Sequence, residues 1–345
     1  VVFDLDKKKI VAKIPTLKDS YYIYQSIETP DGKLLIAGSV PRISFMLVDP
    51  KDWSFQTFYG DVPEKNTVNY YNIFLNEKTL YITSIYASFL FSYPDFKLVK
   101  EIKWPKDIVL GINQRQATTF KGQPILWDSD NADFYVYQFE KDQFFKLNQT
   151  PIDFQFTDNG IAGFIEKPDH KILGIKTNGT CFEVSPEGKV EIKAVMKAFS
   201  RVKGWGLVLA ESKNHQKIFG CSHCVQHMWE IDLKNNSSRH VGKCGPGGGQ
   251  MNASVWDKEN EELFIASYAS CSLMRYKPGI DEIPQLMVTL GYKQTRPLEK
   301  GMKLYNRELW TITLAKLGNR DGALSCYHID KNELTYFKDI LEEQS

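Results

Sequence analysis

The chain has 345 residues, and its 43 basic side chains nearly balance 42 acidic ones, which leaves a net charge of +1. Binding to nucleic acid or to an anionic membrane surface usually requires a concentrated basic surface, so this balance favours neither as a partner. No apolar run approaches the roughly 18 residues of a membrane-spanning helix, so we expect no membrane span.

A pair of apolar runs recurs along the chain and is the strongest structural signal. Residues 34–49, LLIAGSVPRISFMLVD, return in outline as residues 217–232, KIFGCSHCVQHMWEID. In both, an apolar run ends at small residues, a polar turn follows, and a second apolar run ends at Asp, as is typical of a hairpin of two buried strands. Equivalent strand ends recur at spacings of 43, 44, 45, 47, 47, 45 and 53 residues. They are Asp6, Asp49, Tyr93, Gln138, Ser185, Asp232, Lys277 and Asp330.

A repeat in the mid-forties with several short strands predicts an all-β chain folded as a β-propeller, because the 3.6-residue apolar rhythm of helical repeats is absent. We expect a single domain over residues 1–345. Its four-stranded blades are predicted at 20–60, 68–103, 114–148, 159–195, 203–243, 250–291 and 299–340, and residues 1–14 form a further hairpin.

The predicted strands leave the number of blades open. There are eight outer hairpins but only seven inner pairs, which favours seven blades with the terminal hairpin as a clasp that removes the open edges. Eight blades are the alternative, if residues before Val1 are missing. Six cysteines at irregular spacings do not indicate a disulfide framework, which favours a cytoplasmic location over secretion.

The shape of the hairpins carries a resemblance at the level of the fold. Residues 265–279, IASYASCSLMRYKPG, resemble the broad superfamily of bacterial propellers that includes YVTN-type repeats and streptogramin-lyase-like proteins. The resemblance implies the propeller fold and carries no catalytic residue across, since one fold can host many activities.

In a four-stranded blade, the turn between strands two and three lies at the same end as the connection to the next blade. Polar residues gather at this end, where the channel mouth is expected, whereas the opposite end holds ordinary turns such as 212–215 and 257–260. We therefore expect the first end to be functional. Its candidate substrate-binding residues are Arg42, Tyr86, Arg115, Arg201, Trp205, Gln250, Asn252 and Arg296, and its candidate catalytic residues are His223, His227 and Tyr268.

A metal site is one interpretation of the hairpin at residues 217–232. Cys221, His223, Cys224 and His227 offer thiolate and imidazole ligands, which suit a divalent metal such as Zn²⁺. The competing interpretation is that the cysteines are small buried hydrophobes, because successive residues of a strand point to opposite faces. The sequence leaves the cofactor unknown.

The residues at this end of the blades indicate two alternative functions. Several arginines could neutralise a carboxylate while His or Tyr moves a proton, as an enzyme of the lyase or isomerase type would require for a small polar or saccharide-like anion. The glycine-rich residues 245–252 could bring backbone amides close to such a ligand. The alternative is a non-catalytic platform for a protein partner, with Tyr86 and Trp205 as aromatic contacts.

Overall fold

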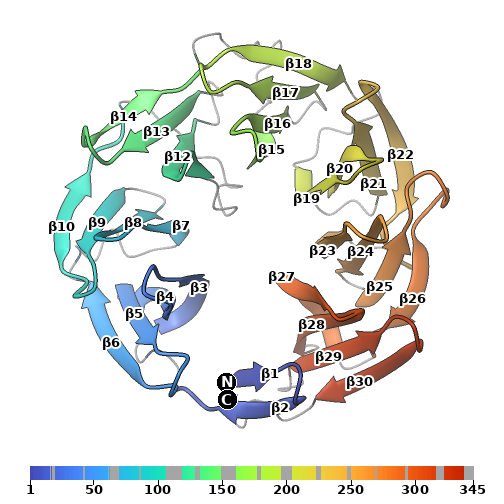
Figure 1. The fold of residues 1–345 in the computed structure, drawn as a ribbon, viewed down its shortest axis with the longest axis horizontal. Coiled ribbons are helices and arrows are strands. Elements are labelled where there is room, and N and C mark those ends of the chain that lie inside the picture. Colours follow the sequence, from blue (N-terminus) through green and yellow to red (C-terminus); the bar gives the residue numbers. More distant parts are fainter. Residues whose placement is uncertain are drawn as a thin grey trace. The chain divides into compact units, whose positions relative to one another are not determined.

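The computed structural model describes most of the chain in segments. The described residues are 1–15, 17, 20–41, 43–60, 62, 70–84, 87–105, 119–128, 133–148, 161–176, 180–195, 204–222, 227–246, 250–268, 270–291, 294–315 and 322–337. Within these segments the chain forms strands and turns and no helix (Figure 1). None of the described residues therefore belongs to a helix that is long and apolar enough to cross a membrane.

The chain divides into two compact units. The first comprises Val1–Phe154, Glu166–Lys171 and Ser185–Lys189. The second comprises Gln155–Ile165, Ile172–Val184 and Val190–Ser345. The prediction of a single domain, and of a clasp formed by the terminal hairpin, stays a prediction.

The described strands of the first unit form one two-stranded sheet and three four-stranded sheets. The two-stranded sheet is β1 (Val2–Asp4) and β2 (Lys9–Ala12), and the four-stranded sheets are β3 (Ser20–Glu28), β4 (Leu34–Pro41), β5 (Ile43–Val48) and β6 (Phe55–Gly60); β7 (Tyr70–Leu75), β8 (Thr79–Ser84), β9 (Ser88–Ser92) and β10 (Leu98–Ile102); and β11 (Thr119–Phe120), β12 (Gln123–Trp127), β13 (Phe134–Gln138) and β14 (Gln143–Lys146).

The described strands of the second unit form four four-stranded sheets, apart from the hairpin-turn residues assigned to the first unit. They are β15 (Ile161–Glu166), β16 (Ile172–Lys176), β17 (Thr180–Val184) and β18 (Val190–Val195); β19 (Gly204–Glu211), β20 (Gln216–Ser222), β21 (His227–Asp232) and β22 (Ser237–Lys243); β23 (Met251–Asp257), β24 (Glu262–Ser267), β25 (Ser272–Tyr276) and β26 (Gln285–Thr289); and β27 (Gln294–Tyr305), β28 (Glu308–Ala315), β29 (Ala323–His328) and β30 (Glu333–Phe337).

Strands that follow one another in the chain also pair with one another. Each four-stranded sheet keeps its strands in chain order, and every described pairing is antiparallel (Figure 1). This up-and-down order is that of propeller blades and confirms the predicted all-β propeller. Seven four-stranded sheets and one two-stranded sheet are consistent with seven or eight blades.

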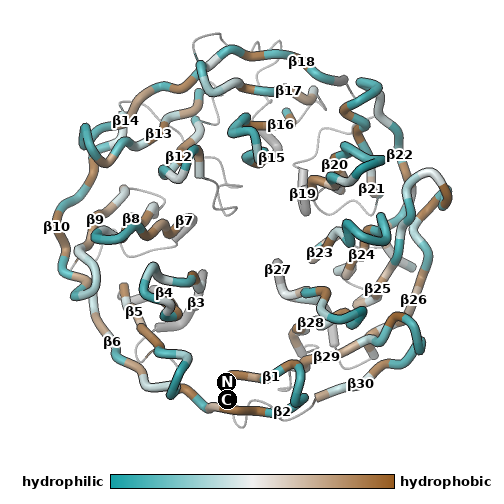
Figure 2. The backbone as a smooth tube through the Cα atoms, viewed as in Figure 1, coloured by the Kyte–Doolittle hydropathy of each residue, from teal (hydrophilic) through white to brown (hydrophobic). Residues whose placement is uncertain are grey.

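Burial differs between the middle and outer strands of a blade. The middle strands β5 and β24 are buried at every position, whereas the outer strands β22 and β26 are largely exposed or half-buried. The tube in Figure 2 accordingly changes from hydrophobic stretches within strands to hydrophilic stretches at many turns. The apolar runs seen in the sequence are thus the middle strands, whose two faces both meet other side chains.

Two apolar clusters hold neighbouring sheets of the second unit together. One cluster joins β19–β22 to β23–β26 and includes Phe219, Met228, Leu263 and Tyr276. Another joins β23–β26 to β27–β30 through residues such as Leu309. These clusters fix the strand ends from which the candidate sites are built.

Candidate functional site

Most of the side chains predicted for the site fall outside the described part of the chain. Trp205 and Arg296 lie in β19 and β27, but their side chains are not among those described. The described candidates are Cys221, His227, Gln250, Asn252 and Tyr268. The candidates that lie outside the described residues are Arg42, Tyr86, Arg115, Arg201, His223 and Cys224.

Three of the described candidates meet at one end of the sheet β23–β26. The backbone N–H of Tyr268 donates to the carbonyl of Gln250 at 2.8 Å. The Gln250 amide donates to Asn252 Oδ1 at 3.3 Å, and Asn252 Nδ2 donates to the carbonyl of Pro297 at 2.5 Å. Gln250 and Asn252 are 7% and 8% exposed, whereas Tyr268 is 38% exposed. The two amides therefore brace the strand ends, and of these three only the Tyr268 side chain is open to solvent.

Gly245, in the described part of the glycine-rich connection, lies against the turn that contains Tyr268. A Cβ atom at Gly245 would lie 2.6 Å from Ser267 Oγ and 2.8 Å from Ser270 Oγ, so only glycine fits there without movement. The hydroxyls of Ser267 and Ser270 are 2.6 Å apart. In this unit the connection into β23 and the β24–β25 turn thus occupy the same end of the strands.

The structure does not bring Cys221 and His227 together. Cys221 is paired across the hairpin with Met228, and both side chains are buried in the same apolar cluster. His227 immediately precedes Met228, so it points to the opposite face of the sheet. The described residues contain no group of three or more His, Cys, Asp or Glu side chains that could hold a metal.

The described cysteines are buried thiols. Cys221 Sγ accepts a hydrogen bond from the backbone N–H of Met251 at 3.1 Å. A hydrogen bond with Cys221, together with burial, raises the pKa of Cys244 well above its usual value. Metals bind the thiolate form, so this environment favours the protonated, structural role of Cys244. The cysteines found free and buried are Cys181, Cys221, Cys244, Cys271 and Cys326.

His227 has a different partner from those predicted. Its Nδ1 lies 2.7 Å from Nε2 of His240 on β22, and the two rings are stacked with centroids 4.6 Å apart. His227 is half-buried and His240 is exposed. Burial, followed by the charge of His227, lowers the pKa of His240, so its neutral form is favoured.

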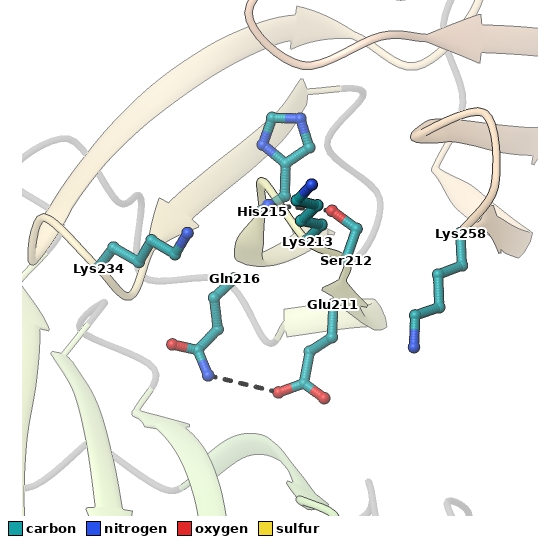
Figure 3. Close-up of a pocket in the computed structure, with 7 residues that line it drawn as sticks. All are labelled: Glu211, Ser212, Lys213, His215, Gln216, Lys234 and Lys258. Atoms are coloured by element: carbon teal, nitrogen blue, oxygen red, sulfur yellow. Dashed lines mark hydrogen bonds between the residues drawn. The ribbon is translucent and has the colours of Figure 1, made fainter.

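A shallow pocket of about 460 Å³ lies at the opposite end of the strands, within the second unit. It is formed by the β19–β20 turn together with residues from the β21–β22 and β23–β24 turns. In Figure 3, Lys234 and Lys258 lie on opposite sides of the view and Lys213 lies between them. We call it the lysine pocket; its lining residues are Glu211, Ser212, Lys213, His215, Gln216, Lys234 and Lys258.

The lysine pocket carries an excess of positive charge. Three lysines face a single lining carboxylate, Glu211, which accepts a hydrogen bond from Gln216 at 3.5 Å (Figure 3). Lys234 donates to the backbone carbonyl of Asn214 at 3.3 Å. Among the described residues, none forms an ion pair or hydrogen bond with the ammonium groups of Lys213 and Lys258.

Two carboxylates of the neighbouring β23–β24 turn, Glu261 and Asp257, have other partners. Glu261 accepts hydrogen bonds from Ser212 Oγ at 2.5 Å and Asn214 Nδ2 at 2.9 Å, and lies 3.6 Å from His215 Nε2. These hydrogen bonds, first that of Asn214, lower the pKa of Glu261 and keep it ionised. Asp257 accepts hydrogen bonds from its own turn and pairs with Arg307 at 2.9 Å. Neither carboxylate is therefore held against Lys213 or Lys258.

Sequence reasoning overlooked the lysine pocket, because residues 212–215 and 257–260 read as ordinary turns. One signal was present: Lys213 and Lys258 are 45 residues apart, one repeat length, in the same turn of consecutive blades. Lys234 lies in the turn between the third and fourth strands, which reaches the same end of the sheet. The repeat therefore predicts that these turns are neighbours, although it does not predict a pocket.

Comparisons with known proteins identify the fold and no family. No family model matches the sequence, and a search of curated proteins found no match. Among solved structures, dihydro-heme d1 dehydrogenase NirN in complex with DHE is similar over 97% of this chain and 70% of its own, with a TM-score of 0.73 and 12% identity.

Two further solved structures, a lyase and a yeast protein, are also similar to this chain. Virginiamycin B lyase from Staphylococcus aureus matches 86% of this chain and 92% of its own, with a TM-score of 0.58 and 8% identity. Saccharomyces cerevisiae Sqt1 matches 93% of this chain and 85% of its own, with a TM-score of 0.62 and 10% identity. At such low identity these likenesses show the β-propeller fold alone.

Proposed function

We propose that this protein binds a small anionic molecule, of the carboxylate or phosphate class, in the lysine pocket. The observation that carries the proposal is the pair of ammonium groups, on Lys213 and Lys258, that border the pocket and form no ion pair or hydrogen bond with the described residues. An anion would supply the missing acceptors, while the Gln216 side chain offers a neutral amide beside it.

The size and openness of the lysine pocket indicate the kind of ligand. Its volume of about 460 Å³ lies within the range of roughly 300–1,000 Å³ common for small-molecule sites. Because Lys213, Lys234 and Lys258 are exposed, salt should screen their attraction for the ligand. We therefore expect a compact anion, held more weakly as ionic strength rises.

The test is the stabilisation of the folded protein by inorganic phosphate, citrate and a hexuronate at constant ionic strength. Saturable binding raises the melting temperature, since a ligand specific for the folded state stabilises it by RT ln(1 + [L]/Kd). At least one anion should stabilise the wild type, and the double variant Lys213→Gln with Lys258→Gln should lose this response.

A matched control separates a site from net charge. Lys51→Gln with Lys331→Gln removes the same charge from exposed turns outside the pocket and should respond as the wild type does. Equal loss in both double variants would reduce the effect to overall charge. No stabilisation of the wild type by any of the three anions would refute the proposal.

A second proposed function is acid–base catalysis on a saccharide-like anion, at the end of the strands where Tyr268 lies. Tyr268 or His227 would take the proton from the carbon beside a carboxylate; the C–O bond to the neighbouring leaving group breaks, a C=C bond forms, and the leaving oxygen is protonated. The partly exposed side chain of Tyr268, beside strand ends held by the Gln250 and Asn252 amides, favours this role.

The two proposed sites are separate. The six-residue strand β24 runs from the turn after Lys258 to Tyr268, and six residues of strand span roughly 17–20 Å. One small molecule does not reach both ends. Turnover of uronate-containing saccharides, followed by the ultraviolet absorbance of the new double bond, should fall in Tyr268→Phe and His227→Ala and persist in the control Tyr59→Phe. Turnover unchanged by both site variants would contradict the assignment.

Binding of a protein partner is the third candidate function. It is favoured by three exposed aliphatic side chains near the start of β26: Ile280, Ile283 and Leu286 are 71%, 53% and 52% exposed. The loop that enters β26 shows a hydrophobic stretch in Figure 2. Cross-linking should then yield one defined partner whose capture is lost in Ile280→Ser with Ile283→Ser and kept in the lysine double variant. Equal capture by the serine variant would exclude this surface.

A further inference from the structure

We propose that His227 and His240 form a binding site for a divalent transition metal that prefers square-planar or tetragonal coordination, with Cu²⁺ as the first candidate. The proposal is independent of anion binding in the lysine pocket, because the two histidines lie on β21 and β22 and take no part in that pocket.

The geometry of the pair matches two adjacent ligands of one metal ion. His227 Nδ1 and His240 Nε2 are 2.7 Å apart. Two imidazole nitrogens at about 2.0 Å from a metal are about 2.8 Å apart at a right angle and about 3.3 Å apart at the tetrahedral angle. The observed separation, that of a hydrogen bond between the rings, is close to the right-angle value that square-planar Cu²⁺ and Ni²⁺ sites require, so little movement would be needed to accept such an ion.

The strand register holds the two rings on one face of the sheet. His240 lies opposite Trp229, and His227 lies two residues before Trp229 on the same strand, so all three side chains share a face. The ring of Trp229 is buried in an apolar cluster on this same face. The histidines are thus cross-strand neighbours on a supported surface, which reduces the reorganisation needed to accept a metal.

The accessibility of the two rings also suits a metal. His227 is half-buried and His240 is exposed, so an ion can enter from solvent. Neither imidazole has a described carboxylate partner, in contrast to His170 and His215, which lie beside Glu166 and Glu261. Both imidazoles can therefore turn a lone pair toward an ion. Water, or the carboxylate of a bound small molecule, would fill the remaining coordination positions. Among divalent metals Cu²⁺ binds such nitrogen sites most tightly.

The test is titration of the full chain with CuCl₂ by calorimetry, together with electron paramagnetic resonance of the bound ion. We expect one equivalent of Cu²⁺ whose spectrum shows coupling to two imidazole nitrogens. Loss even of groups that only orient a metal ligand costs about 10–100-fold in affinity, so His227→Ala and His240→Ala should each weaken this site by at least about tenfold.

His170→Ala is the matched control, because it removes an exposed histidine outside the pair and should leave Cu²⁺ binding unchanged. Substitution of His240 on an exposed strand position should preserve the fold, which circular dichroism checks. The proposal would be overturned if the two alanine variants bound copper with the affinity of the wild type, or if the spectrum showed no imidazole coupling. The pair would then be only a hydrogen bond between two rings.

Discussion

At the scale of single residues, the most consequential charge is the buried carboxylate of Glu230. It accepts hydrogen bonds from Lys217 at 3.1 Å, Arg239 at 2.9 Å and the hydroxyl of Tyr276 at 2.9 Å. Burial alone would raise its pKa, but the hydrogen bond from Arg239 and the charge of Lys217 outweigh burial and lower it. The network connects β20, β21 and β22 to β25 and so ties two neighbouring blades together.

Glu230→Gln should destabilise the folded state at pH 7 by about 2 kcal/mol. This is less than the roughly 3–5 kcal/mol typical of a broken buried pair, because the Arg239 side chain is 43% exposed. The lowered pKa means that the stabilisation is present above the unfolded carboxyl pKa of about 4.3 and is lost as pH falls through the folded value. Urea unfolding at pH 7 and at pH 3 should show a difference that shrinks in acid.

Glu191→Gln provides the comparison for this experiment. Glu191 pairs with Lys193 at 2.9 Å but its side chain is 63% exposed, so its removal should cost less than about 1 kcal/mol at either pH. A Glu230 variant no less stable than the Glu191 variant at pH 7 would show that the buried network contributes nothing measurable.

At the scale of strands and turns, a cross-strand pair of glycine and phenylalanine shapes the blade β15–β18. Gly174 on β16 lies opposite Phe182 on β17, and a Cβ atom at Gly174 would lie 2.2 Å from Cζ of the buried Phe182 ring. Gly174→Ala should therefore cost about 1–3 kcal/mol by overpacking. Phe182→Leu in the same chain should recover part of that loss, measured by urea unfolding of all four proteins.

The control for this pair is a glycine with a different constraint. Gly32 has φ of +77° and nothing within 4 Å of an added Cβ atom, so Gly32→Ala carries a backbone cost alone. Phe182→Leu should not recover that cost. An additive cycle for Gly174 and Phe182 would contradict the direct contact.

The strands could be predicted from the sequence because middle strands have a simple signature. Residues 34–49 and 217–232 each hold two apolar runs, and both runs are buried, so composition alone reveals them. The outer strands, such as β22 with its sequence SSRHVGK, lack that signature and were located through the repeat.

The candidate sites were harder to predict, since they depend on which turns and faces meet. The residues of the 212–215 turn are those of any polar turn, and their charge becomes significant only beside Lys234 and Lys258. The sequence paired His227 with Cys221, yet the alternation of strand faces separates them. His240 is thirteen residues away along the chain and adjacent across the hairpin. Pairing register, rather than residue type, decides these contacts.

At the scale of the whole molecule, the question is whether the terminal hairpin β1–β2 stabilises the rest of the chain. A two-stranded hairpin is only marginally stable alone, so the paired strands β1 and β2 require contacts with other elements. After it, Ile14 and Leu17 pack against Met46 and Val48 of the first four-stranded sheet. If residues 1–12 act as a clasp, their deletion should lower the melting temperature of the whole transition by several degrees, at about 2–4 °C per kcal/mol. An unchanged melting temperature in a scanning calorimeter would show that they are an appendage.

The most direct test of the central claim, anion binding in the lysine pocket, is a crystal structure of the full chain soaked with the anion that stabilises it best. We predict ligand density within hydrogen-bond distance of the ammonium groups of Lys213 and Lys258, beside Ser212 and Gln216. Density at the Tyr268 end with an empty lysine pocket, or an empty pocket at saturating anion, would contradict the claim.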